Sequence, residues 1–268
     1  MLFFKAHHPE TVDTAKPALV ILHGMFGAGD NWLTIARELG AERRVYTIDL
    51  PGHGESAGAM GERPFFYPHL AECVAETLPA LVGFQPVMLC GPSMGGKAAM
   101  ALTLSRPELV AGLMVVDTAP VSYVGAGFNT EVLEMLAQVD PSGVRGRMDL
   151  EASMKQFLDD PIMRGFMLKS LVPLETGGYR WRFDQTAIVE GAEDIADWPE
   201  PSLPIKAFSG PVLFIKGQLS PYIQPERDLP NIVRLFPTAK LSEIAQARHW
   251  VHFDNKARFV SLVREFMG

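Results

Sequence analysis

Cysteine is scarce in this sequence, and long apolar or basic runs are missing. The chain has only two cysteines, Cys73 and Cys90, in 268 residues, which are too few for a disulfide framework. Cys90 lies in an apolar run, where a buried free thiol is the ordinary interpretation. The apolar start at residues 1–4 is too short for the hydrophobic region of a signal peptide. We therefore expect a reducing, cytoplasmic location.

Missing charge clusters and missing phosphate-binding patterns exclude further classes of partner. The formal net charge is −7 and no lysine or arginine run occurs, so we expect neither nucleic acid nor an anionic membrane surface as a partner. No apolar stretch of roughly 18 residues is present, which excludes a membrane-spanning helix. Neither GxGxxG after a strand nor GxxxxGKS/T occurs, and the histidines lack carboxylates or cysteines at metal-ligand spacing. The sequence thus predicts no nucleotide cofactor and no metal.

What is present is a regular alternation of short apolar runs and helical patterns. The chain is 47% hydrophobic, enough for one large α/β domain with an insertion. The predicted strands cover 18–23, 44–50, 86–91, 110–117, 211–216 and 239–244. The predicted helices of this part cover 31–39, 67–82, 97–106, 225–236 and 256–267. Such alternation indicates a mostly parallel sheet with helices on both faces.

Residues 121–207 interrupt this alternation. The pattern there is helical, over 130–139, 150–158, 161–172 and 183–195, with no convincing strand between the segments. We interpret this part as a helical cap (lid) inserted into an α/β core of residues 1–120 and 208–268. A proline-rich stretch, 198–204, marks the return to the core. Most Met and Phe side chains of these helices are expected to pack internally, and a minority to line an acyl pocket.

The pattern that says most about chemistry is GxSxG at residues 91–95. It joins an apolar run to a helical pattern, so Ser93 is expected at a tight turn between strand and helix. Such a turn pushes the serine towards a base, without which a hydroxyl is a poor nucleophile at neutral pH. Gly91 and Gly95 fit because backbones approach closely there. We predict Ser93 as a nucleophile; the alternative is a tight turn with a helix-capping serine.

A second GxSxG match, at residues 54–58 around Ser56, shows why context matters. It also follows a predicted strand, but residues 59–64 after it form a loop pattern. Ser93 is instead followed by a strong helical pattern that ends before Pro107. Because the nucleophile turn requires a helix on its far side, the context selects Ser93 over Ser56.

A serine nucleophile also needs N–H donors for the oxyanion, which the backbone usually supplies. One donor is expected from the residue after the nucleophile, Met94. The other is expected from the glycine-containing loop 23–27, which directly follows an early apolar run. Met25 is the favoured residue in this loop and Phe26 the alternative. A plain loop between a strand and a helix is the non-catalytic interpretation.

Position along the chain selects the general base among seven histidines. Solvation or a structural role is expected for those near the N-terminus, in glycine loops or at the start of a helix: His7, His8, His23, His53 and His69. His249 and His252 lie between the last strand and the last helix, which matches the order nucleophile, acid, histidine. We predict His249, nearer the end of the strand, as the base. His252 is expected to shape the loop.

The third group should be a carboxylate that orients the imidazole and stabilises its charged form. The loop after the strand 211–216 is its most common position, but residues 217–222 contain no carboxylate. Glu226 and Asp228 fall in a predicted helix, too far along. Asp117 ends the preceding apolar strand, where burying a carboxylate without a role would be costly. We predict Asp117 as the acid; the alternative is an Asp that caps the turn before Pro120.

Several segments together resemble the YbfF-type esterases, a branch of the α/β-hydrolase superfamily. They are HGMFG at 23–27, DLPGHGES at 49–56, GPSMGGKAAMAL at 91–102, VVDTAP at 115–120, YRWRF at 179–183, LFIKGQLSPYI at 213–223 and RHWVH at 248–252. The resemblance covers nearly the whole chain and implies an α/β-hydrolase fold with an inserted helical cap. In that branch the triad acid maps onto Asp117, and the late loop carries Ser-Pro as residues 220–221 do here.

The chain departs from the branch at two positions. Arg248 stands where a glycine is usual before the catalytic histidine, and Pro92 stands where the branch has histidine before the serine. Proline removes a possible polar contact beside Ser93 and stiffens the turn. Arg248 places a charge beside the base. Neither change deletes a catalytic group, although both bear on pH optimum and substrate preference.

The predicted function is a serine esterase that hydrolyses small to medium acyl esters through an acyl-enzyme. His249 would deprotonate Ser93, and N–H groups of Met94 and Met25 would hold the oxyanion. The alternatives on the same scaffold are an acyl-CoA thioesterase, a carbon–carbon bond hydrolase or lyase, and a non-catalytic binding protein. A thioesterase would favour a basic pocket for the CoA phosphates, and the sequence shows no such patch.

Overall fold

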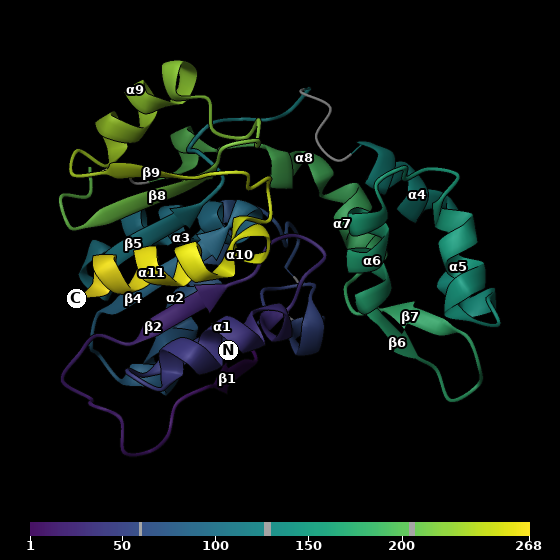
Figure 1. The fold of residues 1–268 in the computed structure, drawn as a ribbon, viewed down its shortest axis with the longest axis horizontal. Helices are drawn as coiled ribbons and strands as arrows, with labels where there is room; N and C mark the ends of the chain where they lie inside the picture. The colour runs from purple at the N-terminus through teal and green to yellow at the C-terminus, as the bar shows by residue number, and fades with distance from the viewer. Residues whose placement is uncertain (59–60, 126–129, 204–206) are drawn as a thin grey trace.

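A twisted seven-stranded sheet lies at the centre of the computed structural model (Figure 1), which describes residues 1–58, 61–125, 130–203 and 207–268. The strand order is β1-β3-β2-β4-β5-β8-β9. All neighbouring pairs are parallel except β1 with β3. The strands are β1 (Phe4–Ala6), β2 (Leu19–Leu22), β3 (Val45–Ile48), β4 (Val87–Pro92), β5 (Val110–Val116), β8 (Val212–Gly217) and β9 (Lys240–Ile244). The predicted parallel sheet of an α/β-hydrolase fold is confirmed.

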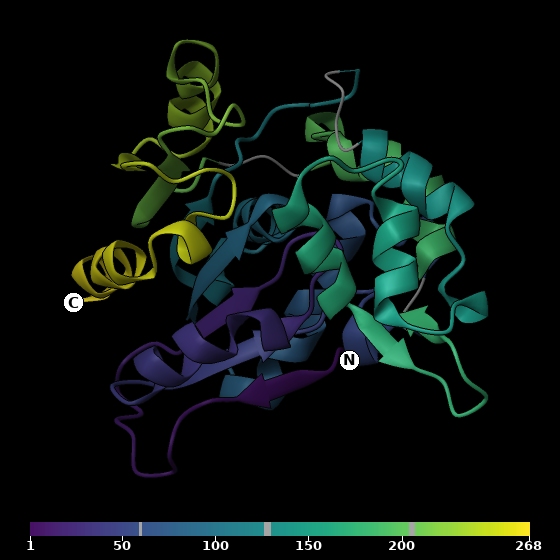
Figure 2. The same cartoon turned by 45° about the vertical axis from the view of Figure 1, so that its right-hand side comes forward.

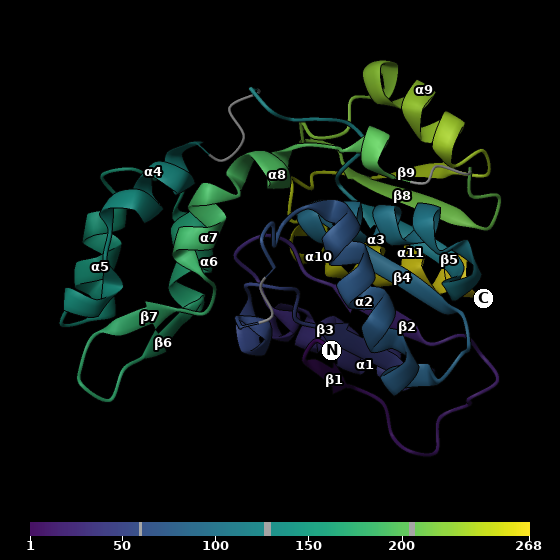
Figure 3. The same ribbon diagram turned by 180° about the vertical axis from the view of Figure 1, so that it is seen from behind.

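Helices cover both faces of the sheet, each over its own apolar cluster. On one face α1 (Leu33–Gly40), α10 (Val251–Asp254) and α11 (Lys256–Met267) pack against alternate side chains of the strands. The other face is covered by α2 (Tyr67–Val82), α3 (Ser93–Ser105) and α9 (Pro225–Leu235), as Figure 3 shows from behind. Strand side chains alternate between the faces, so one strand serves both clusters: in β2, Val20 lies in one and Ile21 in the other.

The carboxyl ends of neighbouring parallel strands meet at one edge of the sheet, and the predicted chemistry lies there. β4 leads into α3 at Ser93, and β5 ends immediately before Asp117. β8 leads into the loop with Ser220, and the loop after β9 carries His249. In open parallel sheets this edge is where ligands bind. Residues more than a hundred positions apart are thereby gathered into one region.

The chain between β5 and β8 forms a separate layer beside the sheet, which we call the insertion (Figure 2). Its helices are α4 (Thr130–Gln138), α5 (Arg147–Met154), α6 (Pro161–Lys169), α7 (Gln185–Glu190) and α8 (Ala192–Ala196). Asp160 begins α6 by accepting the N–H of Ile162 at 2.8 Å, and Asp184 begins α7 by accepting that of Ala187 at 2.9 Å. Of the proline-rich return predicted at 198–204, residue 204 lies outside the described part.

The expectation that the insertion contains no strand is wrong. β6 (Leu171–Pro173) and β7 (Tyr179–Trp181) pair antiparallel as a hairpin. Three-residue strands are too short to show an alternation of polar and apolar positions, so periodicity could not reveal them. The turn between them uses Gly177 and Gly178, whose φ angles are 89° and 77°. That conformation favours glycine.

Two smaller details also differ from expectation. The helix predicted over 183–195 is divided into α7 and α8 at Gly191, where a Cβ would lie 2.6 Å from the ring of Phe65. The N-terminal residues, which carried no strand prediction, include the edge strand β1. None of the described helices is long and apolar enough to cross a membrane.

Candidate active site

Ser93 stands at the tight turn that its sequence context predicts. It begins α3 directly after β4, and its φ of 48° lies in the left-handed region. A non-glycine residue is strained there, which is typical of exposed nucleophile turns. A Cβ on Gly91 would come within 2.5 Å of the backbone of Gly95, and one on Gly95 would overlap the carbonyl oxygen of His23. The turn therefore requires both glycines.

The competing serine, Ser56, has a different environment. It lies in a short 3₁₀ helix, Gly54–Ser56, and is buried. Its Oγ accepts the N–H of Phe3 at 2.8 Å, which ties the N-terminal strand to this loop. Residues 59 and 60 of the loop predicted after it lie outside the described residues. Ser56 does not line the cavity that Ser93 lines.

His249 is oriented by a carboxylate. Its Nδ1 lies 2.7 Å from Oδ2 of Asp117, and its ring stacks on Tyr222 with 4.1 Å between ring centres. Because Nδ1 donates to the carboxylate, Nε2 is the nitrogen left to act as a base. His249 and Ser93 line the same cavity. Within the described chain no hydrogen bond joins these two side chains, and such bonds are often long before substrate binds.

Asp117 is the carboxylate that the structure brings to His249. It is fully buried and has a φ of 52°. Its Oδ1 accepts the N–H of Gly217 at 3.0 Å, and its Oδ2 accepts the hydroxyl of Ser220 as well as Nδ1 of His249. Hydrogen bonds of this kind stabilise a buried carboxylate in its charged form. The other candidate, Asp228, instead pairs with Arg227 at 2.6 Å.

Ser220 is a site residue that the sequence reasoning did not assign a role. It lies in the loop after β8, where a carboxylate is most common and is missing here. Its hydroxyl contributes a donor to Asp117 from that position. The available signal was the Ser-Pro pair shared with the YbfF-type branch, but a serine in a loop does not reveal its partner 103 residues away.

The loop 23–27 presents its backbone to the same cavity. Phe26, with a φ of 65°, donates its N–H to Nε2 of His53 at 3.3 Å. The N–H of Met25 has no acceptor among the described residues. Met94 is the second residue of α3, in the first turn of the helix, where N–H groups lack intrahelical acceptors. The geometry therefore favours Met25 over Phe26 as a donor to a bound oxyanion.

Two buried histidines fix this loop. His23 donates from Nδ1 to the carbonyl of Gly24 at 2.8 Å and accepts the N–H of Leu50 at Nε2, 2.9 Å away. Burial lowers the pKa of His23 to about 4. Burial, with His23 nearby, lowers the pKa of His53 to about 3. Both rings are thus neutral at physiological pH, and the structural role expected for them fits these contacts.

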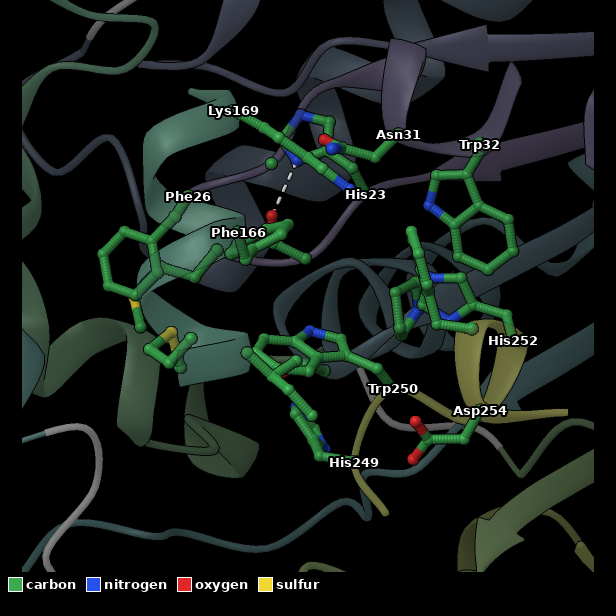
Figure 4. Close-up of a pocket in the computed structure, with 18 of the residues that line it drawn as sticks. His23, Phe26, Asn31, Trp32, Phe166, Lys169, His249, Trp250, His252 and Asp254 are labelled. Carbon is green, nitrogen blue, oxygen red and sulfur yellow. Dashed lines mark hydrogen bonds between the residues drawn. The ribbon is translucent and has the colours of Figure 1, made fainter. Parts of the chain in front are cut away.

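The cavity has a volume of about 300 Å³ and lies between the strand ends and α6 of the insertion. The cavity lining is mostly apolar and includes Met163 and Phe166 of α6 and Trp250. Figure 4 shows Phe166 and Trp250 in this lining. A minority of the insertion's apolar residues thus reaches the cavity. Such a space suits a small ester with a hydrocarbon portion.

Neither departure from the YbfF-type pattern blocks the cavity. Pro92 lines it beside Ser93. Arg248 turns to Asp254, whose Oδ2 accepts the backbone N–H of Arg248 at 2.7 Å and lies 3.7 Å from its Nε. The positive charge next to His249 is therefore paired. Over the described ranges, no group of three His, Cys, Asp or Glu side chains is arranged to hold a metal ion.

Comparison with known proteins gives a consistent picture. The family model described as alpha/beta hydrolase fold matches residues 17–256. The chain is 35% identical to sn-1-specific diacylglycerol lipase ABHD11 of Mus musculus over 96% of this chain and 82% of that protein. It is 31% identical to esterase YbfF of Escherichia coli, covering 93% of this chain and 92% of the other. A solved marine microorganism esterase superposes with a TM-score of 0.89 at 34% identity, covering 99% of this chain and 98% of that one.

Proposed function

Because this chain belongs to the α/β-hydrolase family, as a YbfF-type serine ester hydrolase, we propose that it cleaves small to medium acyl esters with Ser93, His249 and Asp117. One observation carries the assignment of residues. Nδ1 of His249 lies 2.7 Å from the buried carboxylate of Asp117, in the cavity that Ser93 also lines.

In the proposed reaction Nε2 of His249 takes the proton from Oγ of Ser93 as the oxygen attacks the ester carbonyl. Asp117 holds Nδ1–H and stabilises the imidazolium that forms. The oxyanion of the tetrahedral intermediate accepts the N–H groups of Met94 and Met25. The intermediate collapses, and the alcohol leaves with the proton from His249. Water, deprotonated by the same imidazole, then hydrolyses the acyl-enzyme and regenerates Ser93.

The insertion has a role in this proposal. Residues 121–207 act as the cap over the core of residues 1–120 and 208–268, and the acyl chain lies against α6. The support is the cavity wall, because Met163 and Phe166 belong to the insertion while Ser93 and His249 belong to the core. Closing a reacting ester between two such layers excludes water from the developing charge.

Active-site labelling tests the assignment of the nucleophile. A fluorophosphonate probe should form one adduct, with loss of fluoride, on the oxygen of Ser93, and hydrolysis of p-nitrophenyl butyrate should stop at the same stoichiometry. Ser93→Ala should lose both labelling and hydrolysis. Ser56→Ala is the matched control, because it removes the serine of the other GxSxG match and should keep both.

Two results would contradict the proposal. Ser93→Ala protein with an unchanged circular dichroism spectrum and wild-type esterase activity would place the nucleophile elsewhere. A wild-type protein that neither reacts with the probe nor hydrolyses any ester in a chain-length panel would favour a non-catalytic binding protein.

A further inference from the structure

His252 is a buried residue of the cavity that the proposed reaction does not use. The residue is 6% exposed, and its ring stacks on Trp32 with 4.1 Å between centres and 14° between planes. It lies on α10, three positions after His249, and lines the same cavity. The face-to-face contact of the two rings holds the imidazole of His252 in one orientation.

The hydrogen-bonding state of His252 follows from its two nitrogens. Nδ1 is sealed from solvent and has no partner within the described part of the chain. Nε2 also makes no hydrogen bond to a described residue, but it is not sealed. Burial, with His249 nearby, lowers the pKa of His252 to about 3, so the ring is neutral. Burying an N–H without an acceptor is costly, so we place the proton on Nε2, where a bound ligand can accept it.

Two other donors, Asn31 and Lys169, line the same cavity, and Figure 4 labels them together with Trp32 and His252. Phe253 lies beside both His252 and Lys169. Asn31 uses its Oδ1 to accept the N–H of Ala28 at 2.6 Å, which leaves its NH₂ group as a donor. Lys169, the last residue of α6, has its Nζ 5.2 Å from the centre of the Phe253 ring. Among the described side chains no carboxylate pairs with Lys169.

Unpaired carboxylates are lacking at this end of the cavity in the described part of the chain. Asp254 is the one carboxylate among the described lining residues, and its charge is paired with Arg248. The other lining side chains here are aromatic or aliphatic. A ligand group that enters this end therefore meets N–H donors and one positive charge, and it meets no unpaired carboxylate among the described lining residues.

We propose that Lys169, His252 and Asn31 form a subsite for a carboxylate carried by the ester substrate. This inference rests on the proposed esterase function and names its substrate class: short esters with a second, anionic carboxyl group. Lys169 contributes the charge from the insertion, and His252 a fixed N–H from the core. Met163, Phe166 and Trp250 contact the hydrocarbon between that carboxylate and the scissile bond.

Matched ester pairs test this preference. p-Nitrophenyl hydrogen glutarate against p-nitrophenyl valerate places the carboxylate on the acyl side, and 4-acetoxybenzoate against 4-acetoxybenzamide places it on the alcohol side. We expect kcat/KM to favour the carboxylate in one pair by about 10-fold or more, chiefly through KM, as for a hydrogen bond to a charged group. Equal or lower efficiency for both carboxylate esters would overturn the subsite.

Variants test the roles of Lys169 and His252 in the subsite. Lys169→Met and His252→Phe should each lower the ratio of kcat/KM for the carboxylate ester to that for its neutral partner by about 5-fold or more. Phenylalanine keeps the stacking on Trp32, and His252→Gln, which restores an N–H donor, should recover part of the ratio. Lys155→Met removes an exposed lysine of the insertion outside the cavity and should leave the ratio unchanged. Unaltered ratios in both Lys169→Met and His252→Phe would refute the assignment.

Equilibrium binding separates this inference from the esterase proposal. Ser93→Ala protein, which cannot turn over, should bind glutarate by titration calorimetry and should lose that binding in the Lys169→Met background. Binding of inorganic phosphate but not of glutarate would overturn the carboxylate assignment. If neutral esters are hydrolysed in a Ser93-dependent way while glutarate fails to bind, the subsite fails and the esterase stands.

Discussion

Ser220 donates its hydroxyl to Oδ2 of Asp117, the carboxylate oxygen that also accepts from Nδ1 of His249. A carboxylate is most common in the loop after β8, but here that loop supplies the hydroxyl donor Ser220. The carboxylate comes instead from Asp117, directly after β5. Asp117 is thereby held from β8 by two donors, the Ser220 hydroxyl and the N–H of Gly217.

Ser220→Ala should lower kcat without abolishing activity. The variant removes one hydrogen bond to a charged carboxylate, and we expect a loss of about 10-fold in kcat with little change in KM. The loss is expected because Asp117, held by one donor fewer, orients the imidazole of His249 less firmly. Ser220→Thr keeps the hydroxyl and should restore most of kcat. An unchanged kcat in Ser220→Ala would show that Asp117 orients His249 without this hydroxyl.

Asp117→Asn should be far more damaging. An amide has one acceptor oxygen, so its NH₂ group must face either the N–H of Gly217 or the donors Ser220 and His249. The variant therefore loses a hydrogen bond that orients this group, and His249 loses its counter-charge. We expect kcat to fall by about 10³- to 10⁴-fold, as for the equivalent change in serine proteases. Asp228→Asn is the matched control, because that carboxylate pairs with Arg227 instead. A larger loss in Asp228→Asn than in Asp117→Asn would reverse the assignment.

The sequence predicts the parts of the proposed site that depend on local patterns. Ser93 is predicted from a strand, a glycine turn and a helix in succession, and the structure has that succession. Asp117 is predicted from its place at the end of an apolar strand and from the lack of a carboxylate at residues 217–222. The contact of Ser220 with Asp117 spans 103 positions, and the stacking of His252 on Trp32 joins two residues that are far apart in the sequence. Such contacts depend on the order of the strands in the sheet, and the periodicity of the sequence does not encode that order.

Sequence patterns fail to predict short elements for a related reason. β6 and β7 have three residues each, so neither shows a period. Gly177 and Gly178 do signal a turn, but a turn alone does not distinguish a hairpin from a loop between helices. The division of one predicted helix at Gly191 depends on its contact with Phe65 in a distant loop. Local propensity predicts whether a long element is a helix or a strand, but it does not predict changes that depend on tertiary contacts.

Gly95→Ala should destabilise the protein, because its methyl group would overlap the carbonyl oxygen of His23. Forcing α3 away from β2 is expected to cost about 1–3 kcal/mol or more in the free energy of unfolding. Gly58 holds the corresponding position in the other GxSxG match and has nothing within 4 Å of its Cβ position. Gly58→Ala should therefore change stability by less than about 0.5 kcal/mol. Urea denaturation of both variants checks this, and equal midpoints would contradict the close packing at Gly95.

Lys97 links the helix of Ser93 to the end of the insertion, and its burial should make stability depend on pH. Nζ donates to the carbonyls of Ala196 and Asp197 at 2.8 and 2.7 Å, and lies 4.6 Å from the ring centre of Tyr123. Burial lowers the pKa of Lys97 from 10.5 to about 7. Between these values the unfolded chain binds a proton that the native state does not, so the free energy of unfolding rises with pH in this window.

Lys97→Met removes that group, so the stability of wild type relative to the variant should increase from pH 7 to pH 10. The slope should not exceed about 1.4 kcal/mol per pH unit, the value for one proton. Below pH 7 the native and the unfolded state both bind the proton, and the difference in the free energy of unfolding between wild type and variant should become constant. Urea denaturation at pH 6, 7, 8, 9 and 10 measures it, with Lys155→Met as the exposed control. A constant difference across the whole range would mean that Lys97 keeps its charge in the native protein, held by the two carbonyls and the ring of Tyr123.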